Sequence, residues 1–171
     1  MPVRDIQAWN VALLDINNAP ISVAGLATEF TLPTLEREFD TDKRAGESGV
    51  VPRPKFITEM VATIKLMSTS EEFENAMLSN LAKPVTLQLK ASAADTVTGI
   101  TVPYIVSLRG YFSEYPLGDF TDMGMEQEIT MMISYVSKTF GSNIVIIDPK
   151  NYIYSINGIN LWAGVKTELG L

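Results

Sequence analysis

The carboxylates around Gly124 come closer to a chemical site than any other side chains of this sequence. They are Asp119, Asp122, Glu126 and Glu128, and carboxylate oxygens are ligands that calcium prefers. An EF-hand loop needs ligands at its first, third and fifth positions and a glutamate at its twelfth, and this spacing fails here. We therefore interpret the cluster as a solvated acidic turn and not as a metal site.

Other reactive patterns are equally incomplete. The pairs Glu36 with Glu38 and Glu71 with Glu72 could support acid–base chemistry, but a polar loop and the dipole of a helix N-terminus account for them. The run Gly164-Val165-Lys166-Thr167 lacks the residue order of a phosphate-binding loop. The sequence therefore predicts no catalytic residues and no cofactor.

The absence of cysteine and histidine narrows the chemistry further. It excludes disulfides, thiol nucleophiles and Cys/His zinc sites. It also removes the side chain that is best suited to proton transfer near neutral pH. A structural or interaction role is favoured over an enzyme.

Charge and hydropathy indicate which partners to expect. The net charge is -7, with 13 basic against 20 acidic residues, whereas nucleic-acid binding depends on clustered Lys and Arg. Charged residues make up 19% of the chain, below the roughly 25% that is usual, which suggests apolar surface for protein partners. The longest strongly apolar run, residues 144–147, is too short to span a membrane, and the N-terminus lacks a signal-peptide core. We expect a cytoplasmic product with no membrane contact.

Most of the chain alternates apolar and polar residues, a pattern typical of β-strands. The clearest pair covers residues 85–91 and 100–108, and the small polar connector between them predicts a long hairpin. Pro103 cannot donate to a ladder, so we expect the second strand at an edge or a bulge. An open sheet edge invites a partner.

The remaining elements are predicted in the same way. Thr69-Ser70-Glu71-Glu72 has capping-box spacing and predicts one helix, whose apolar stripe we assign to Phe73, Met77, Leu78 and Leu81. Residues 34–54 and 113–125 are predicted to be loops. Further strands are predicted over residues 5–16, 21–32, 56–67, 126–140, 144–147 and 152–156, with a hairpin turn at Asn157-Gly158. About eight strands and one helix indicate a mainly β fold, an antiparallel sandwich or barrel in a single domain over residues 1–171.

Several strings, taken in order, resemble the major tail tube proteins of contractile-tailed bacteriophages. They are Thr31-Leu32-Pro33-Thr34-Leu35, the charged loop through Lys43-Arg44-Ala45-Gly46, Leu108-Arg109-Gly110, the hairpin over residues 135–147, Ile156-Asn157-Gly158-Ile159-Asn160, and Gly170-Leu171. The ordered set and the matching length carry the resemblance, which runs from about residue 20 to the end. Residues 113–125 are richer in aromatic side chains than the family pattern.

This resemblance implies a tail-tube fold of two packed antiparallel sheets, a sandwich or half-barrel, with one flanking α-helix. It implies hexameric rings that stack into a tube inside a contractile sheath and form the conduit for DNA ejection. The expected partners are other copies of the chain and the sheath, baseplate, tail terminator and tape measure proteins, while DNA passes without specific binding. The protein would be a late structural component of the virion, assembled in the host cytoplasm, with kinship to R-type bacteriocin tubes and the type VI secretion tube protein.

The tube hypothesis assigns roles to two sets of charged residues. A long loop over residues 35–55 is expected to reach the next ring, and a C-terminal arm over residues 159–171 to pack across a neighbour. An acidic bore would repel the phosphates of passing DNA. The candidates for the inter-ring contact are Asp40, Asp42, Lys43, Arg44 and Glu47, and those for the lumen are Glu36, Glu38, Glu59 and Glu128.

Two alternatives remain open from the sequence. The first is a monomeric β-barrel that binds a small apolar ligand in its interior, with the helix as a lid. The second is an enzyme that uses carboxylates alone.

Overall fold

The structure is a computed structural model, and it describes residues 4–14, 19–41, 48–49, 52–121, 124–168 and 170. The side chains of residues 53–56 and 121 are not described. In chain order the elements are β1 (Arg4–Leu14), β2 (Pro20–Ser22), β3 (Ala27–Thr31), β4 (Arg37–Asp40), β5 (Arg53–Ile57), β6 (Met60–Leu66), α1 (Glu71–Ser79), β7 (Val85–Asp95), β8 (Thr101–Glu114), β9 (Asp119–Thr121), β10 (Gly124–Phe140), β11 (Asn143–Asp148), a 3-10 helix (Pro149–Asn151), β12 (Ile153–Ile156), β13 (Ile159–Asn160) and α2 (Ala163–Glu168).

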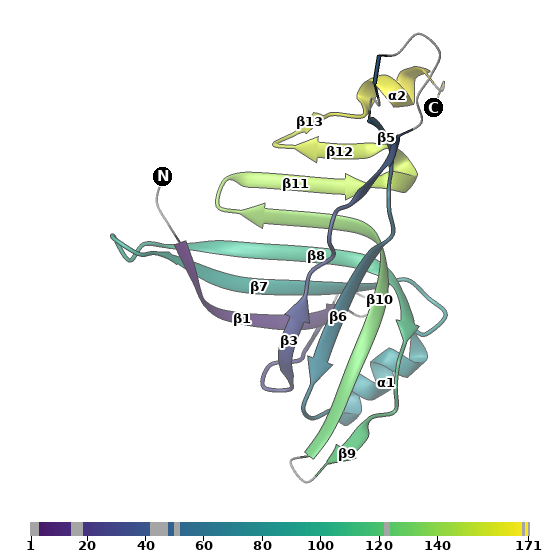
Figure 1. Ribbon diagram of the computed structural model, residues 1–171. Helices are drawn as coiled ribbons and strands as arrows, with labels where there is room; N and C mark the ends of the chain where they lie inside the picture. The colour runs from purple at the N-terminus through teal and green to yellow at the C-terminus, as the bar shows by residue number, and fades with distance from the viewer. Residues whose placement is uncertain are drawn as a thin grey trace.

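The long strand β10 joins two limbs of an antiparallel sheet (Figure 1). The first limb contains β8, β7, β1 and β2 together with β11, β12 and β13, and the second limb contains β6 and β3. Its first part, residues 127–133, pairs with β6, and β6 pairs in turn with β3. Its last part, residues 136–140, pairs with β11, which continues to β12 and β13. The opposite edge of β10 pairs with β9 and β8, and the sheet continues from β8 through β7 to β1 and β2. The predicted mainly β, antiparallel fold is confirmed, and its two layers are limbs of one hydrogen-bonded network.

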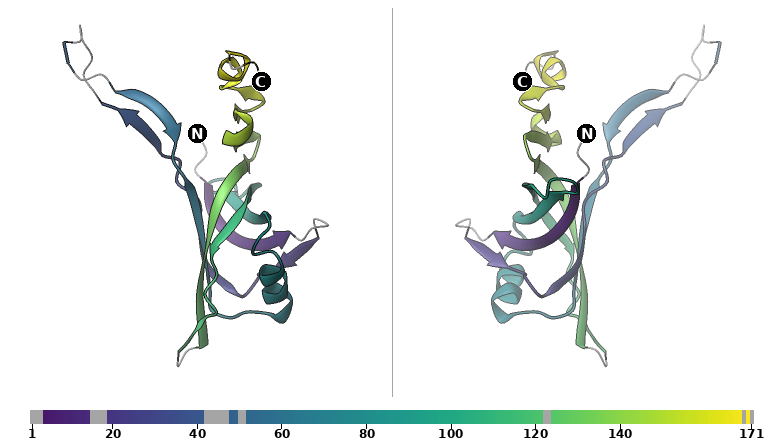
Figure 2. Two further views of the ribbon diagram at one scale, coloured as in Figure 1. Left: turned by 90° about the vertical axis from the view of Figure 1, so that its right-hand side faces the viewer. Right: turned by 90° about the vertical axis from the view of Figure 1, so that its left-hand side faces the viewer.

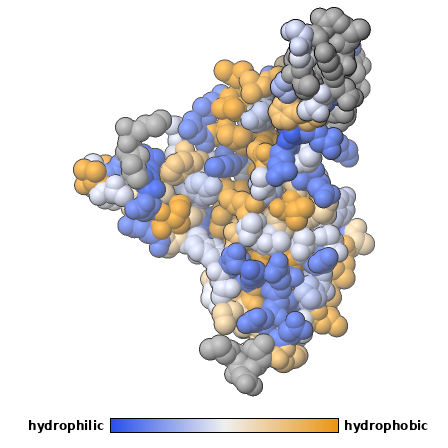
Figure 3. Space-filling model, in the orientation of Figure 1, coloured by the Kyte–Doolittle hydropathy of each residue, from blue (hydrophilic) through white to orange (hydrophobic). Residues whose placement is uncertain are grey.

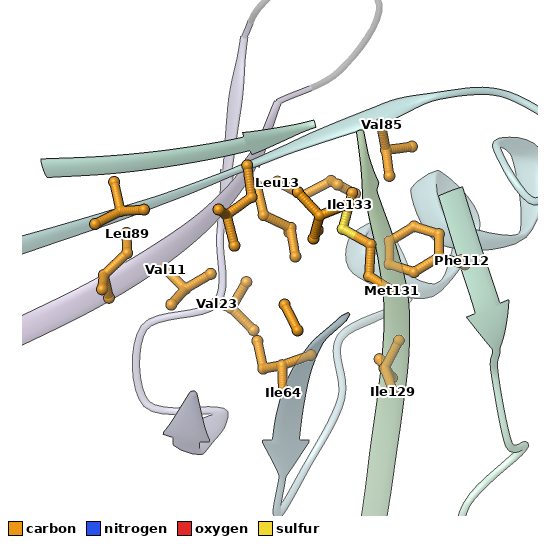
Figure 4. Close-up of a cluster of buried hydrophobic side chains, with 14 of the residues drawn as sticks. Val11, Leu13, Val23, Ile64, Val85, Leu89, Phe112, Ile129, Met131 and Ile133 are labelled. Atoms are coloured by element: carbon orange, nitrogen blue, oxygen red, sulfur yellow. The ribbon is translucent and has the colours of Figure 1, made fainter. Parts of the chain in front are cut away.

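A single apolar core fills the angle between the two limbs (Figure 4). Alternate residues of each long strand point inward, as the period-two pattern predicts. On β6 the buried set is Met60, Ala62, Ile64 and Leu66. The other strands contribute Val11 and Leu13, Val85, Leu87 and Leu89, Val106, Leu108 and Phe112, and Ile129, Met131, Ile133 and Val136.

Helix α1 forms where the capping box predicts it. The Ser70 hydroxyl accepts a hydrogen bond from the Phe73 N–H (3.2 Å), and Phe73 and Met77 are buried. Leu78 and Leu81, which the sequence placed on the same stripe, are instead 47% and 44% exposed. Leu78 lies one residue beyond the buried Met77 and so points to another face, and Leu81 follows the end of the helix.

A second helix, α2, occupies the segment predicted as a C-terminal arm, and it buries none of its residues. The sequence predicted one helix because this segment has no capping box or apolar stripe. In the described part of the chain, neither α-helix has the length and apolar character needed to cross a membrane.

Three segments differ from the sequence prediction. The strand expected over residues 21–32 is divided into β2 and β3 by a turn at Gly25, whose φ is 76°. The loop expected over residues 35–55 contains the paired strands β4 and β5, and the one over residues 113–125 contains β9. None of the described side chains on these short strands is fully buried, so their backbone pairing leaves no apolar alternation in the sequence.

Pro103 does not place β8 at an edge of the sheet, so that prediction is wrong. Strand β8 pairs with β7 on one side and with β10 on the other. The ladder to β10 ends at Tyr104 opposite Phe140, and the Gly141 N–H donates to the Pro103 carbonyl (3.2 Å). The nitrogen of Pro103 faces the same side as its carbonyl, one residue beyond the ladder, so its missing N–H costs no ladder bond.

The predicted hairpins are confirmed. Strands β7 and β8 pair in register from Val85 opposite Gly110 to Ala94 opposite Thr101. The turn between β12 and β13 has φ values of 50° at Asn157 and 86° at Gly158, positive at both central residues as a type I′ turn requires.

Gly110 permits a close approach of β8 and β10. It lies opposite Ile133, where the pairing of β8 and β10 shifts register toward Tyr135. A Cβ atom at residue 110 would lie 1.9 Å from the Met132 carbonyl oxygen and 2.9 Å from the Ile133 Cα. Since both contacts are to backbone atoms, only glycine fits without moving β10.

We predict that Gly110→Ala destabilises the fold by about 2 kcal/mol or more, because the strands must separate and lose packing. Urea unfolding followed by circular dichroism measures the change. Gly164→Ala is the matched control, since no atom lies within 4 Å of the Cβ it would add. Equal unfolding midpoints for the two variants would contradict the assigned role of Gly110.

Candidate assembly surfaces

The first half of β1 presents an open strand edge. Strand β2 covers β1 only at Ala12, Leu13 and Leu14, and no other described strand pairs with that side of β1. The Val11 carbonyl faces the same side, where it accepts the Val23 N–H (2.9 Å). Because alternate residues of a strand face the same side, the N–H and C=O of Trp9 point to the open edge. Residues 5–10 are all exposed, so this edge is available for another strand.

An apolar hollow lies beside this edge, on the face of the sheet that carries the core. It is the surface lined by Ile6, Trp9, Phe30, Leu32, Leu89, Ala91 and Tyr104. Ile6 and Trp9 remain 52% and 40% exposed. The Lys138 ammonium lies 5.2 Å from the centroid of the Tyr104 ring, so a cation stands next to the apolar surface. The core face of the sheet thus extends beyond the part that the second limb covers.

At the opposite end of the sheet, β12 has partners on both sides within the molecule, and the end strand is the two-residue β13. On β12, the Tyr154 N–H donates to the Asn160 side-chain oxygen (3.0 Å), and the Tyr154 carbonyl accepts the Leu161 N–H (2.8 Å). The Asn160 side-chain amide donates to the Tyr152 carbonyl (3.1 Å). The two ends of the sheet therefore differ: β12 is covered along its outer side by local partners, whereas residues 5–10 of β1 pair only with β7 among the described strands.

The β4–β5 hairpin projects away from the two limbs (blue in Figure 2). The Glu36 carbonyl at its base accepts the Thr58 N–H (2.9 Å). Phe39 on β4 is 54% exposed although it is aromatic. Asp40, an inter-ring candidate, is half-buried at the end of β4. The other four candidates, Asp42, Lys43, Arg44 and Glu47, lie outside the described residues.

The four lumen candidates occupy separate elements. Glu36 and Glu38 are exposed on the projecting hairpin, Glu59 is exposed between β5 and β6, and Glu128 is exposed on β10. The structure therefore does not gather all four on one strand or one face. Only Glu128 lies on a long strand of the sheet.

Glu128 belongs to a charged group that the sequence analysis missed. The Lys65 ammonium lies 2.9 Å from a Glu29 carboxylate oxygen and 4.0 Å from one of Glu128. The hydrogen bond to Glu29, followed by the negative charges of Glu29 and Glu128, raises the pKa of Lys65. Register explains the group, because Lys65 is paired with Glu29 on β3 and with Glu128 on β10. This exposed hydrophilic surface lies over the lower part of β6 and β10 (Figure 3).

Three of the acidic residues near Gly124 line one surface hollow. Asp119 on β9 is paired with Glu126 on β10, and Glu128 lies two residues farther along β10, while Asp122 is outside the described residues. Among the described residues, no three acidic side chains are grouped closely enough to hold a metal ion. What the described surface offers is open backbone and apolar side chains, which are features of association.

The tip of the β7–β8 hairpin is a second apolar projection. Val97 is 88% exposed and Ile100 is 65% exposed, while Asp95 beneath them is buried. The Asp95 carboxylate accepts the N–H groups of Thr98 (2.8 Å) and Val97 (2.9 Å). These hydrogen bonds hold the pKa of Asp95 below its usual value, and the bond from the Thr98 N–H has the largest effect. An ionised carboxylate therefore orders a tip whose apolar side chains face outward.

Comparison with known proteins identifies a family. The profile of the family described as phage tail tube protein FII matches residues 16–170 of the chain, which confirms the resemblance carried by the ordered strings. No curated protein matches the sequence. The fold is similar to Hcp1 from Flavobacterium johnsoniae, with 14% identity, a TM-score of 0.45, and coverage of 83% of this chain and 99% of that chain. A mutant form of Hcp1 from the E. coli EAEC 042 pathovar shows 11% identity, a TM-score of 0.45, and coverage of 82% and 97%.

We predict that Asp95→Asn reduces the loss of stability in acid. The folded-state pKa of Asp95 is depressed, so its contribution is full above the unfolded pKa of about 3.9 and is lost as pH falls toward the folded value. Asparagine keeps the acceptor oxygen and removes the titration. Urea unfolding at neutral pH and near pH 3 should show a smaller difference for the variant than for the wild type. Asp119→Asn, on exposed β9, is the control, and an equal pH effect in both variants would refute the role of Asp95.

Proposed function

Because the chain belongs to the phage tail tube protein FII family, we propose that its copies form hexameric rings that stack into the inner tube of a contractile phage tail. The tube lies inside the sheath and is the conduit through which DNA leaves the particle. Residues 1–171 act as a single tail-tube domain. The protein is a structural component of the virion and not an enzyme.

The open edge of β1 is the observation that supports this proposal most directly. A strand edge exposes unpaired N–H and C=O groups, and soluble proteins usually shield such edges. A neighbouring copy that adds a strand would satisfy them, and repetition of one head-to-tail contact around an axis closes a ring. The exposed apolar side chains Ile6 and Trp9 on β1 would be buried by the same contact.

Contacts between rings involve the projecting segments. The β4–β5 hairpin stands clear of the body (Figure 2), and its charged extension carries the inter-ring candidates Asp40, Asp42, Lys43, Arg44 and Glu47. The C-terminal segment, with β13 and α2, packs across a neighbour. Its exposed side chains Ile159 (69%) and Leu161 (56%) supply apolar surface for that contact.

The remaining partners follow from the position of a tube inside a tail. The sheath protein surrounds it, the baseplate and tail terminator proteins hold its ends, and the tape measure protein lies within it during assembly. Assembly takes place in the host cytoplasm. Of the lumen candidates Glu36, Glu38, Glu59 and Glu128, the last lies on a long strand of the sheet, and it faces the bore and repels the phosphates of DNA, which passes without specific binding.

We predict that the purified protein forms rings or tubes at high concentration and that Trp9→Pro abolishes them. Proline removes the N–H that points to the open edge of β1 and leaves the ladder to β7 intact. Trp9→Ala is the matched control, since it removes the same side chain but keeps the N–H, and it should retain more assembly than the proline variant. Negative-stain electron microscopy and analytical ultracentrifugation measure the products. A wild-type protein that stays monomeric would refute the tube and favour the ligand-binding barrel.

We predict that Glu128→Lys slows DNA passage, because a cation in the bore would attract phosphate. Particles that carry the variant should eject their genome more slowly at low salt than wild-type particles, and added salt should reduce the difference. Glu72→Lys, on exposed α1, changes the net charge equally and serves as the control. Unchanged ejection kinetics in Glu128→Lys would remove this residue from the wall of the bore.

A further inference from the structure

We infer that β4 of one copy adds as an edge strand to β1 of a neighbouring copy and inserts Phe39 into the apolar hollow. This inference rests on the proposed self-assembly: β4 completes the open edge of a neighbour within the same ring, and the charged extension that follows β4 is the part that reaches the next ring. It identifies the occupant of the hollow as a second copy of this chain.

Both strands have a side that no described strand pairs with. Strand β4 pairs with β5 alone among the described strands, which leaves residues 37–39 for a new partner. The open part of β1 is residues 5–10, where Trp9 directs its backbone groups outward. A four-residue strand matches the short length of this edge. The projection of the β4–β5 hairpin (Figure 2) places β4 beyond its own body, where a neighbour can reach it.

The apolar hollow explains why Phe39 is exposed in a single copy. Ile6 and Trp9 lie both on the open strand and in the hollow, so any strand added to β1 has alternate side chains above that hollow. Phe39 is 54% exposed, and its flanking residues are Glu38 and Asp40. Its insertion would bury an aromatic ring among Trp9, Tyr104 and aliphatic side chains, a favourable arrangement for aromatic packing.

Charge is complementary on the other face of the added strand. The side chain of Glu38 points to the opposite face from that of Phe39, because neighbouring residues of a strand alternate between the two faces. On that face of the receiving sheet lie Ala8, Asn10 and the exposed Lys90, with Asn10 and Lys90 directly paired. Glu38 would therefore approach Lys90 while Phe39 fills the hollow.

Cysteine cross-linking tests this arrangement without interference, because the chain has no native cysteine. Asn10→Cys and Glu38→Cys are prepared separately, because Glu38 beside Lys90 lies opposite Asn10. One of them carries a mass tag, and the two are mixed under reducing conditions that permit assembly. After oxidation, a covalent heterodimer should appear on a non-reducing gel, because directly paired side chains can meet disulfide geometry. The matched control mixes Glu38→Cys with Asn75→Cys, on the exposed face of α1. The heterodimer yield should exceed the control at least about tenfold.

A second measurement addresses the hollow itself. Phe39→Ala should raise the protein concentration needed for assembly about tenfold, because the variant has no phenyl side chain to transfer from water into the hollow. Leu35→Ala removes a comparably exposed apolar side chain (48%) that precedes β4 and should have a smaller effect. Circular dichroism of the single copies should be unchanged in both variants.

The outcomes separate this inference from the proposed function. If tubes form but cross-linking does not exceed the control, or Phe39→Ala assembles like wild type, the β4–β1 contact is overturned and the tube stands. If the wild-type protein forms no rings or tubes under any assembly condition, the proposed function fails. Selective cross-linking within tubes supports both.

Discussion

Backbone pairing on both sides of β10 is the constraint on which the rest of the structure depends. This strand has 17 residues, and its partner on one side changes from β6 to β11 along its length. Two register shifts against β8, before Met131 and before Tyr135, accompany this change. Bulges bend and twist a strand, so one continuous ladder can supply two diverging limbs. Gly110 fits at the second shift because it has no Cβ to collide with the backbone of β10.

The divergence of the limbs also decides what is left uncovered. The core fills the angle near β6, β7 and β10, where side chains from both limbs meet (Figure 4). Farther along β1 the second limb covers the sheet only in part: Phe30 lines the same hollow as Ile6 and Trp9, which remain exposed beside an open strand edge. In a monomer both features would promote nonspecific association. In a tail tube protein they are the surfaces that a neighbouring copy is suited to cover.

The net charge of -7 does not describe the surroundings of individual carboxylates, which differ from one part of the surface to another. On the surface over β3, β6 and β10, Lys65 lies between Glu29 and Glu128 and offsets part of their charge. An acidic bore built from Glu128 would therefore be weaker than a count of acids implies. At the β7–β8 tip, in contrast, Asp95 is held ionised by backbone N–H groups and orders a turn whose exposed side chains are apolar. At this tip, the charged carboxylate of Asp95 fixes the conformation of a projection whose outer side chains are apolar.

The sequence by itself determined the elements whose signals are local. Alternation in residues 85–91 and 100–108 predicted β7 and β8, the Ser70 capping box predicted α1, and Asn157-Gly158 predicted the last hairpin, because each depends on neighbouring residues only. The ordered strings also indicated the family. Only the tertiary structure decided that β8 is internal despite Pro103, that Lys65 joins Glu29 to Glu128, and that β1 is open while β12 is closed. Those facts depend on which strands pair and in what register, and pairing joins residues far apart in the chain, where alternation alone does not name the partner.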